Sequence, residues 1–161
     1  LNILRSVPFL IMMITIQPLT RMIVGTTIGT RAAIVALVVS AAPFVARMVE
    51  QSLLEIDHGV IEAAQSMGAS NTQIIAKVLL PESKPSLLNG ALVSATTILG
   101  YSAMAGFIGG GGLGDIAIRY GYNRYDTGTM LITVVLLVIL VQIIQSVGSR
   151  IAKRSDKRIN D

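Results

Sequence analysis

The chain has 161 residues, of which 52% are hydrophobic and only 14% are charged, against roughly a quarter in soluble domains, so its composition is that of a membrane protein. Because it has no cysteine and a single histidine, a disulfide framework, a thiolate metal site and a histidine cluster are excluded. The net charge of +4 does not indicate nucleic-acid binding, since the basic residues concentrate in a tail after an apolar helix rather than among stacking aromatics.

Four apolar stretches are predicted as transmembrane helices of one all-α domain covering residues 1–161. They span about residues 6–24, 31–54, 84–105 and 127–149. The first is the weakest, because its uncharged part contains Pro8 and Pro18 and is shorter than the ~20 apolar residues that a straight span needs. The last is the clearest, because its Leu, Ile and Val residues outweigh Gln142 and Gln145 on an insertion scale.

The distribution of basic residues predicts the orientation. Lys and Arg collect on cytoplasmic flanks, so the basic tail 150–161 and the polar loop 55–83 are expected inside, and the glycine-rich loop 106–126 is expected outside. Nine of the thirteen basic residues then lie on the cytoplasmic side. The other four are Arg21, Arg31, Arg119 and Arg124.

The outer loop contains six glycines between Gly106 and Gly114, which predicts a backbone too flexible for a regular helix. We expect a turn, a re-entrant piece or a close helix contact there. A phosphate-binding loop is not expected, because Asp115 follows Gly114 where such a loop needs Lys followed by Ser or Thr. The charged residues that follow, Asp115, Arg119 and Asp126, either contact a binding protein outside or keep the loop solvated.

The polar loop predicts a helix, a tight turn and a second helix. Apolar residues recur at helical spacing over its first half, at Ile56, Val60, Ala63, Ala64 and Met67. Gly68 suits the left-handed position that ends a helix, and Ser70 with Gln73 matches a capping box that begins the second helix. Pro81 is expected to stop that second helix.

Two interpretations of this helical pair remain open from the residues alone. It is either an amphipathic pair resting on lipid, the commoner case, or a knob whose small residues and Glu62 are presented to a partner protein. Interfacial helices usually carry Lys and Arg on their polar face, and the first helix here has neither, which weakens the lipid interpretation.

A family resemblance favours the partner interpretation. The loop resembles the "EAA" loop of ABC-importer membrane subunits, with valine in place of the usual isoleucine. The residues that carry the resemblance are Glu62, Ala63, Ala64, Gly68, Val78, Leu80 and Pro81. It implies a type I importer permease fold, and for these residues a role in coupling to an ABC ATPase.

Other stretches look like methionine-uptake permeases, and the likeness covers nearly the whole chain. They are residues 5–9, 42–50, 53–56 and 100–104. The family has five spans and this chain shows four, so its first span is expected to be missing. Asp57 stands where proline is common, although aspartate is itself a good helix N-cap.

The resemblance implies a translocation subunit of an ATP-driven importer in the bacterial inner membrane. Its expected partners are a second copy of itself, two ATPase subunits, a substrate-binding protein outside and the lipid bilayer. The chain itself is expected to be no enzyme and to bind no cofactor, with ATP and Mg²⁺ held by the ATPase. Tyr101, Ser102 and Met104 are either pathway-lining residues or helix-packing residues. Alternatives are an importer for another small amino acid or peptide, and a membrane scaffold or channel subunit.

Overall fold

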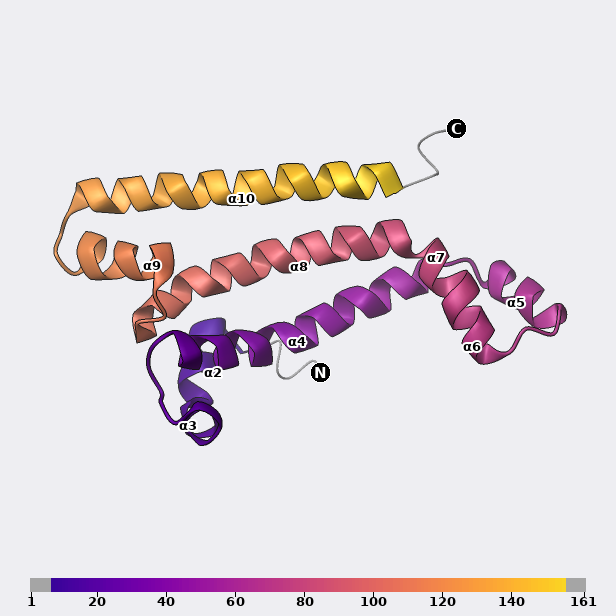
Figure 1. The fold of residues 1–161 in the computed structure, drawn as a ribbon, viewed down its shortest axis with the longest axis horizontal. Coiled ribbons are helices and arrows are strands. Elements are labelled where there is room, and N and C mark those ends of the chain that lie inside the picture. Colours follow the sequence, from indigo (N-terminus) through magenta and orange to yellow (C-terminus); the bar gives the residue numbers. More distant parts are fainter. Residues whose placement is uncertain (1–6, 156–161) are drawn as a thin grey trace.

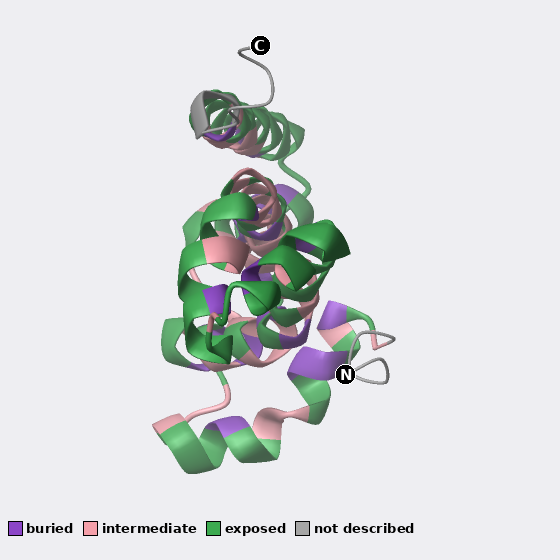
Figure 2. Cartoon of the chain, turned by 90° about the vertical axis from the view of Figure 1, so that its right-hand side faces the viewer, coloured by how far each residue is buried: buried purple, intermediate pink, exposed green. Residues whose placement is uncertain are grey.

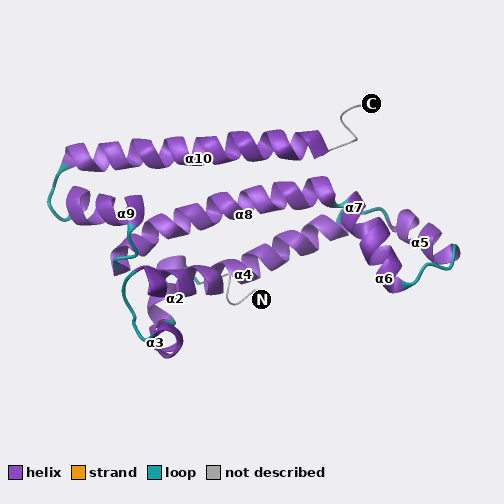
Figure 3. Cartoon of the chain, viewed as in Figure 1, coloured by secondary structure: helices purple, strands orange, loops and turns teal. Residues whose placement is uncertain are grey.

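The computed structural model describes residues 7–155, with side chains described through residue 152. Residues 1–6, which include part of the first resembling stretch, and residues 156–161 of the predicted tail lie outside the described residues. Throughout the described part the chain is helical and contains no strand (Figure 3). In order, the elements are α2 (Phe9–Thr15), α3 (Gln17–Val24), α4 (Thr30–Leu54), α5 (His58–Ser66), α6 (Asn71–Ile74), η1 (Ile75–Leu79), α7 (Leu80–Glu82), α8 (Lys84–Met104), η2 (Ala105–Ile108), α9 (Gly112–Ile116), η3 (Ala117–Tyr122) and α10 (Thr127–Ser155).

Three helical segments of the described chain are long and apolar enough to cross a membrane. They are Thr30–Leu54, Lys84–Ile108 and Thr127–Ala152, with mean hydropathies of 2.1, 1.5 and 2.6. Figure 1 shows α8 between α4 and α10, and α8 contacts both. Many residues of these helices, above all those of α10, are exposed (Figure 2), as expected for helices whose apolar side chains lipid can solvate.

The stretch of about residues 6–24, predicted as a span that contains Pro8 and Pro18, is not a single helix. The stretch divides into α2 and α3, with Ile16 between them. Pro18 lies in the first turn of α3, where it lacks a backbone N–H and its ring crowds the carbonyl of Ile14, so a single helix cannot run through it undisturbed. The described residues therefore contain three span-length helices instead of four.

The remaining predicted spans correspond to α4, α8 and α10, with one difference in length. The sequence predicts a span that ends at residue 149, and α10 continues to Ser155. The start of the predicted basic tail therefore belongs to the same helix as the apolar span.

The small core lies between α2, α4 and α8. Phe9, Met13 and Ala36 are buried together. The Phe9 ring stacks on the Tyr101 ring, with the two ring centres 4.9 Å apart and the planes inclined by 3°. This contact fixes α2 against the end of α8 that is remote from α5–α7.

The glycine-rich loop is more helical than predicted. Residues 106–126 contain α9 and the π-helical η3, both of which contact α10. The glycines permit close backbone contact: a Cβ atom on Gly106 would lie 2.5 Å from the carbonyl carbon of Gly114, and one on Gly114 would overlap the carbonyl of Ala103. Of the three expected arrangements, the close helix contact is confirmed.

Candidate functional site

The polar segment 55–83 projects from one end of the three long helices, and α9 lies at the other end (Figure 1). Helix α5 lies in the first half of this segment. In the second half, α6, η1 and α7 form one continuous helical stretch. The helix, turn and helix that the sequence predicts are therefore present.

Helix α5 begins at an aspartate cap and buries only part of its apolar face. The Asp57 carboxylate accepts a hydrogen bond of 2.6 Å from the backbone N–H of Gly59, which confirms that aspartate can start this helix. Ala64 is buried, whereas Val60 is 43% exposed and Met67 is 83% exposed. An amphipathic helix that served only to cover its own fold would bury these side chains.

The turn after α5 is a Schellman motif centred on Gly68. Gly68 has φ of +79°, the left-handed conformation predicted for it. Its N–H donates to the carbonyl of Gln65 at 2.9 Å, and the N–H of Ala69 donates to the carbonyl of Ala64 at 3.1 Å. These two bonds satisfy carbonyls that the end of α5 would leave unpaired, so the turn is specified locally.

The predicted capping box at the start of α6 is confirmed. The backbone N–H of Gln73 donates to Ser70 Oγ at 3.4 Å, and the backbone N–H of Ser70 donates to Gln73 Oε1 at 2.9 Å. Together, the Schellman turn and the capping box fix the angle between the two helices without help from distant residues.

Replacing Ser70 by alanine is expected to destabilise this segment by ~1 kcal/mol, because one N–H at the start of α6 loses its acceptor. The measurement is hydrogen exchange of the backbone amides of residues 70–76 in the purified protein, which should accelerate. Thr72→Ala is the matched control, since Thr72 is exposed and its side chain makes no hydrogen bond within the described residues. Equal exchange in both variants would argue against the capping role.

The prediction that Pro81 stops the second helix is wrong. The π-helical turn η1 lies directly before it, and the N–H of Leu80 donates to the carbonyl of Ile75, five residues back. The wider turn shifts the hydrogen-bond register just where proline has no N–H to donate, and the helix continues to Glu82. Pro85 then lies in the first turn of α8, as the sequence indicates.

The coupling residues that the resemblance implies differ in exposure. Glu62 and Ala63 are exposed on α5, and the Glu62 carboxylate has no hydrogen bond or ion pair with any described residue. Leu80 and Pro81 are exposed, while Ala64 is buried and Val78 is half-buried. The exposed residues are therefore the ones available for contact with another protein.

Sequence reasoning missed a polar cavity at the root of this segment. Its volume is about 280 Å³, and it lies where the end of α4 meets the start of α8. The lining residues are Ser52, Glu55, Ile56, Glu82, Ser83, Pro85, Ser86 and Asn89. No periodicity could reveal it, because residues some thirty positions apart meet only when α4 packs on α8.

The three predicted pathway residues are not brought together around one cavity. Tyr101 is half-buried against Phe9, and Ser102 Oγ donates to the carbonyl of Leu99 in its own helix at 2.8 Å. Met104 is 42% exposed. Tyr101 thus packs on Phe9, and Met104 is the most exposed of the three.

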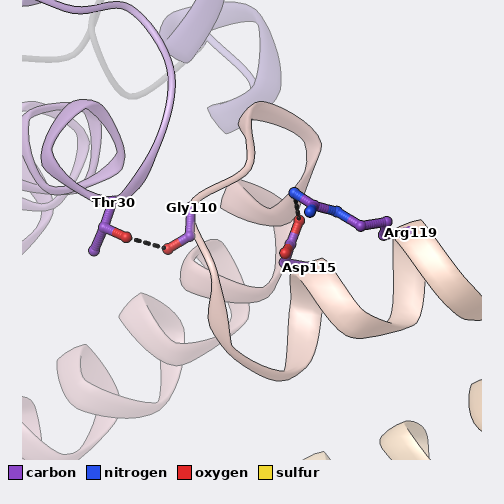
Figure 4. A network of polar contacts seen from close by, with 4 residues as sticks. All are labelled: Thr30, Gly110, Asp115 and Arg119. Carbon is purple, nitrogen blue, oxygen red and sulfur yellow. Dashed lines mark hydrogen bonds and ion pairs between the residues drawn. The ribbon is translucent and has the colours of Figure 1, made fainter.

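The end of the bundle that carries α9 is held by contacts of the glycine-rich loop with α4. Thr30 Oγ1 donates to the carbonyl of Gly110 at 3.1 Å, and the N–H of Gly29 donates to the carbonyl of Ile108 at 2.8 Å. In the same region an Arg119 nitrogen lies 3.3 Å from an Asp115 carboxylate oxygen (Figure 4). The ion pair between Arg119 and Asp115 is accessible to solvent, so it contributes little to stability.

Asp126 caps α10 at the same end. The hydroxyl of Thr129 donates to its carboxylate at 2.6 Å and the backbone N–H of Thr129 donates at 3.1 Å. These bonds, chiefly that of the hydroxyl, hold the pKa of Asp126 below its usual value. All three charged residues suggested for contact with a binding protein, Asp115, Arg119 and Asp126, thus already have partners inside the chain.

The described residues offer no group of three or more His, Asp or Glu side chains that could hold a metal ion. The arrangement as a whole can do one thing chemically: it presents a rigid pair of helices, with free apolar side chains and a free carboxylate, beyond the end of a membrane-spanning bundle.

A family model described as "Binding-protein-dependent transport system inner membrane component" matches residues 1–161. The chain belongs to this family. It is accordingly a permease subunit, a multi-pass component of the inner membrane, and its three span-length helices fit that assignment.

Several known proteins are similar in sequence to this permease over almost its whole length. A Vibrio cholerae protein named "Probable D-methionine transport system permease protein MetI" is 59% identical over 157 residues, which are 98% of this chain and 70% of that protein. A Bacillus subtilis protein named "Methionine import system permease protein MetP" is 48% identical over 157 residues, again 98% of this chain and 71% of the relative. A solved chain described as an inward-facing conformation of the MetNI methionine ABC transporter matches with a TM-score of 0.93 at 54% identity, over 97% of this chain and 72% of that one.

Proposed function

We propose that this permease is the translocation subunit of an ATP-driven methionine importer. The observation that carries the proposal is the 59% identity, over 98% of the chain, to a protein named as a D-methionine permease. The solved chain of a methionine ABC transporter, which shares the fold at a TM-score of 0.93, supports the same substrate class.

In this proposal the projecting segment 55–83 docks on the ATPase. The ATPase supplies the nucleotide and Mg²⁺ chemistry, and the permease contributes a surface that moves with it. The exposed side chains of Val60 and Met67 support the proposal, because contact with a partner would remove their apolar surface from water. The free carboxylate of Glu62 would meet a basic or hydrogen-bonding group on the ATPase.

The proposed orientation places α5–α7 in the cytoplasm and α9 outside. Two observations support it: these elements lie at opposite ends of the long helices (Figure 1), and most basic residues belong to the α5–α7 end and the C-terminal tail. The ATPase would then bind inside, where ATP is available.

The proposed assembly contains two permease chains, two ATPase subunits and an external binding protein. The binding protein would contact the α9–η3 end, where Arg124 is exposed. The Arg124 guanidinium lies 4.7 Å from the centre of the Tyr120 ring, which orients it at the surface. The substrate pathway would run between the two permease chains, and Met104 is the residue best exposed to contribute to it.

The test of substrate class is uptake competition in cells that carry the full-length permease with its ATPase and binding protein. We expect unlabelled methionine, in D or L form, to suppress uptake of labelled methionine, while other amino acids in equal excess have little effect. Equal suppression by another small amino acid or by a peptide would overturn methionine as the substrate, but it would leave the proposal of an importer intact.

The importer class itself is tested by copurification. The detergent-solubilised permease is expected to bring down an ABC ATPase that is co-expressed with it. If it brings down none while remaining inserted and folded, the importer proposal fails and a scaffold or channel subunit becomes the better explanation.

A further inference from the structure

An open groove of about 740 Å³ lies where α2, α3 and the loop before α4 meet. Its lining combines the polar side chains of Gln17, Arg21 and Thr27 with apolar side chains that include Ile14 and Met22. None of the three polar side chains makes a hydrogen bond or an ion pair with any described residue. The groove therefore offers one cation and two further polar groups that the fold leaves unpaired.

The groove lies at the boundary of the membrane. It belongs to the end of the bundle that carries α9 (Figure 1). The uncharged run of α4 begins directly after Arg31, so this end of α4 lies where arginine side chains reach the headgroups of the lipids. Helix α3 crosses the direction of the long helices (Figure 1), as a helix that lies in the plane of the interface does.

Arg21 has no counter-ion in this part of the chain. The sequence contains no aspartate or glutamate before Glu50. At the same end of the described structure, the carboxylates of Asp115 and Asp126 already bind partners inside the chain. A guanidinium pairs with carboxylate or phosphate through two parallel hydrogen bonds. The anion that complements Arg21 therefore comes from outside these residues, and at a bilayer boundary phosphate is the abundant one.

The apolar side chains around the groove favour lipid over water. Ile14 is 56% exposed, Ile23 is 60% exposed and Met22 is 84% exposed. Exposure of this much apolar surface costs free energy in water, whereas acyl chains solvate it. A phospholipid carries both features that the groove requires, because its phosphate and its acyl chains belong to one molecule.

We propose that this groove binds an anionic phospholipid, whose phosphate pairs with Arg21 and whose acyl chains lie on Ile14 and Met22. The amide of Gln17 and the hydroxyl of Thr27 each have a hydrogen to donate to the phosphate oxygens. A headgroup with net negative charge is favoured over a zwitterionic one, because the zwitterion adds a cation close to Arg21. The inference goes beyond the transport function and depends on neither the substrate nor the ATPase.

The test is lipid binding to the full-length permease, purified in detergent with its native partners. Native mass spectrometry measures its affinity for added phosphatidylglycerol and, separately, for phosphatidylcholine with the same acyl chains. Arg21→Gln is expected to weaken phosphatidylglycerol binding roughly tenfold, because one charge-assisted pair is lost. The matched control is Arg31→Gln, which should bind as the unaltered protein does. Arg31 is exposed at the same end and has no ion pair with a described residue, but it does not line the groove.

A photoactivatable group on the acyl chain of phosphatidylglycerol gives a second readout on the unaltered protein, which does not require Arg21→Gln to fold. We expect its cross-links to concentrate on residues 14–22. Equal losses of affinity in the two arginine variants, equal binding of the two lipids, or cross-links spread evenly over the helices would overturn the proposal. It would also fail if Arg21→Gln kept its lipid affinity but lost a copurifying binding protein, because the groove would then belong to that protein.

Discussion

Replacing Gly68 by arginine is expected to abolish ATPase copurification and methionine uptake while leaving the permease inserted in the membrane. Gly68 has φ of +79°, and a Cβ atom added there would meet no heavy atom of the chain within 4 Å. The arginine side chain therefore has room within the permease itself. The large, charged side chain would project from the turn between α5 and α6, where the ATPase is proposed to make contact.

A second effect of this substitution has to be separated from the first. A left-handed backbone costs an L-residue roughly 1–2 kcal/mol, whatever its side chain. Gly68→Ala carries that strain without the bulk, so it is the matched control and should keep most of the copurified ATPase. If Gly68→Arg retained normal uptake, the proposed docking surface would not include the turn at Gly68. If both variants lost ATPase binding equally, backbone strain in the turn would explain the loss.

Gly114→Ala is expected to destabilise the permease strongly. A Cβ atom at Gly114 would lie 2.6 Å from the Cα of Ala103 and would overlap its carbonyl oxygen. These are backbone atoms of α8, which cannot rotate away as a side-chain end can. Overpacking typically costs ~1–3 kcal/mol, and this contact belongs at or above the upper end of that range because α9 must move off α8.

The measurement is the yield of monodisperse protein and its melting temperature in detergent. Gly100→Ala is the control, because Gly100 lies inside α8 and a Cβ there would meet nothing within 4 Å. It should be neutral or slightly stabilising, since alanine is the better helix former by ~1 kcal/mol. Similar melting temperatures for the two variants would show that α9 does not pack on α8 as described.

Local sequence signals predicted the helices and turn of residues 55–83 well, because local hydrogen bonds specify them. Asp57, Gly68 and the Ser70–Gln73 pair each satisfy backbone groups within a few residues, so their roles can be recognised from residue type and spacing. The rule for Pro81 failed, because a π-helical turn compensated for the missing N–H, and no residue pattern announces such a turn.

Prediction was weakest where packing decides the structure. Pro8 and Pro18 weaken the prediction of a span over residues 6–24, but only the tertiary structure shows α2 and α3 as separate helices. The glycines predict a flexible glycine-rich loop. Glycine permits both conformational freedom of the backbone and close approach of two backbones, and the sequence cannot distinguish these two uses. The proximity of the Ala103 carbonyl to Gly114 decides for close approach.

By itself, the sequence determined the membrane class, the positions of three of its four predicted spans, the helix–turn–helix at residues 55–83 and, through its motif, the importer family. These follow from composition, periodicity and local capping, all of which act over a few turns of chain. Only the tertiary structure decided that Tyr101 packs on Phe9 and that α9 lies against α8. Such features depend on which helix faces meet, and residues far apart in sequence fix that together.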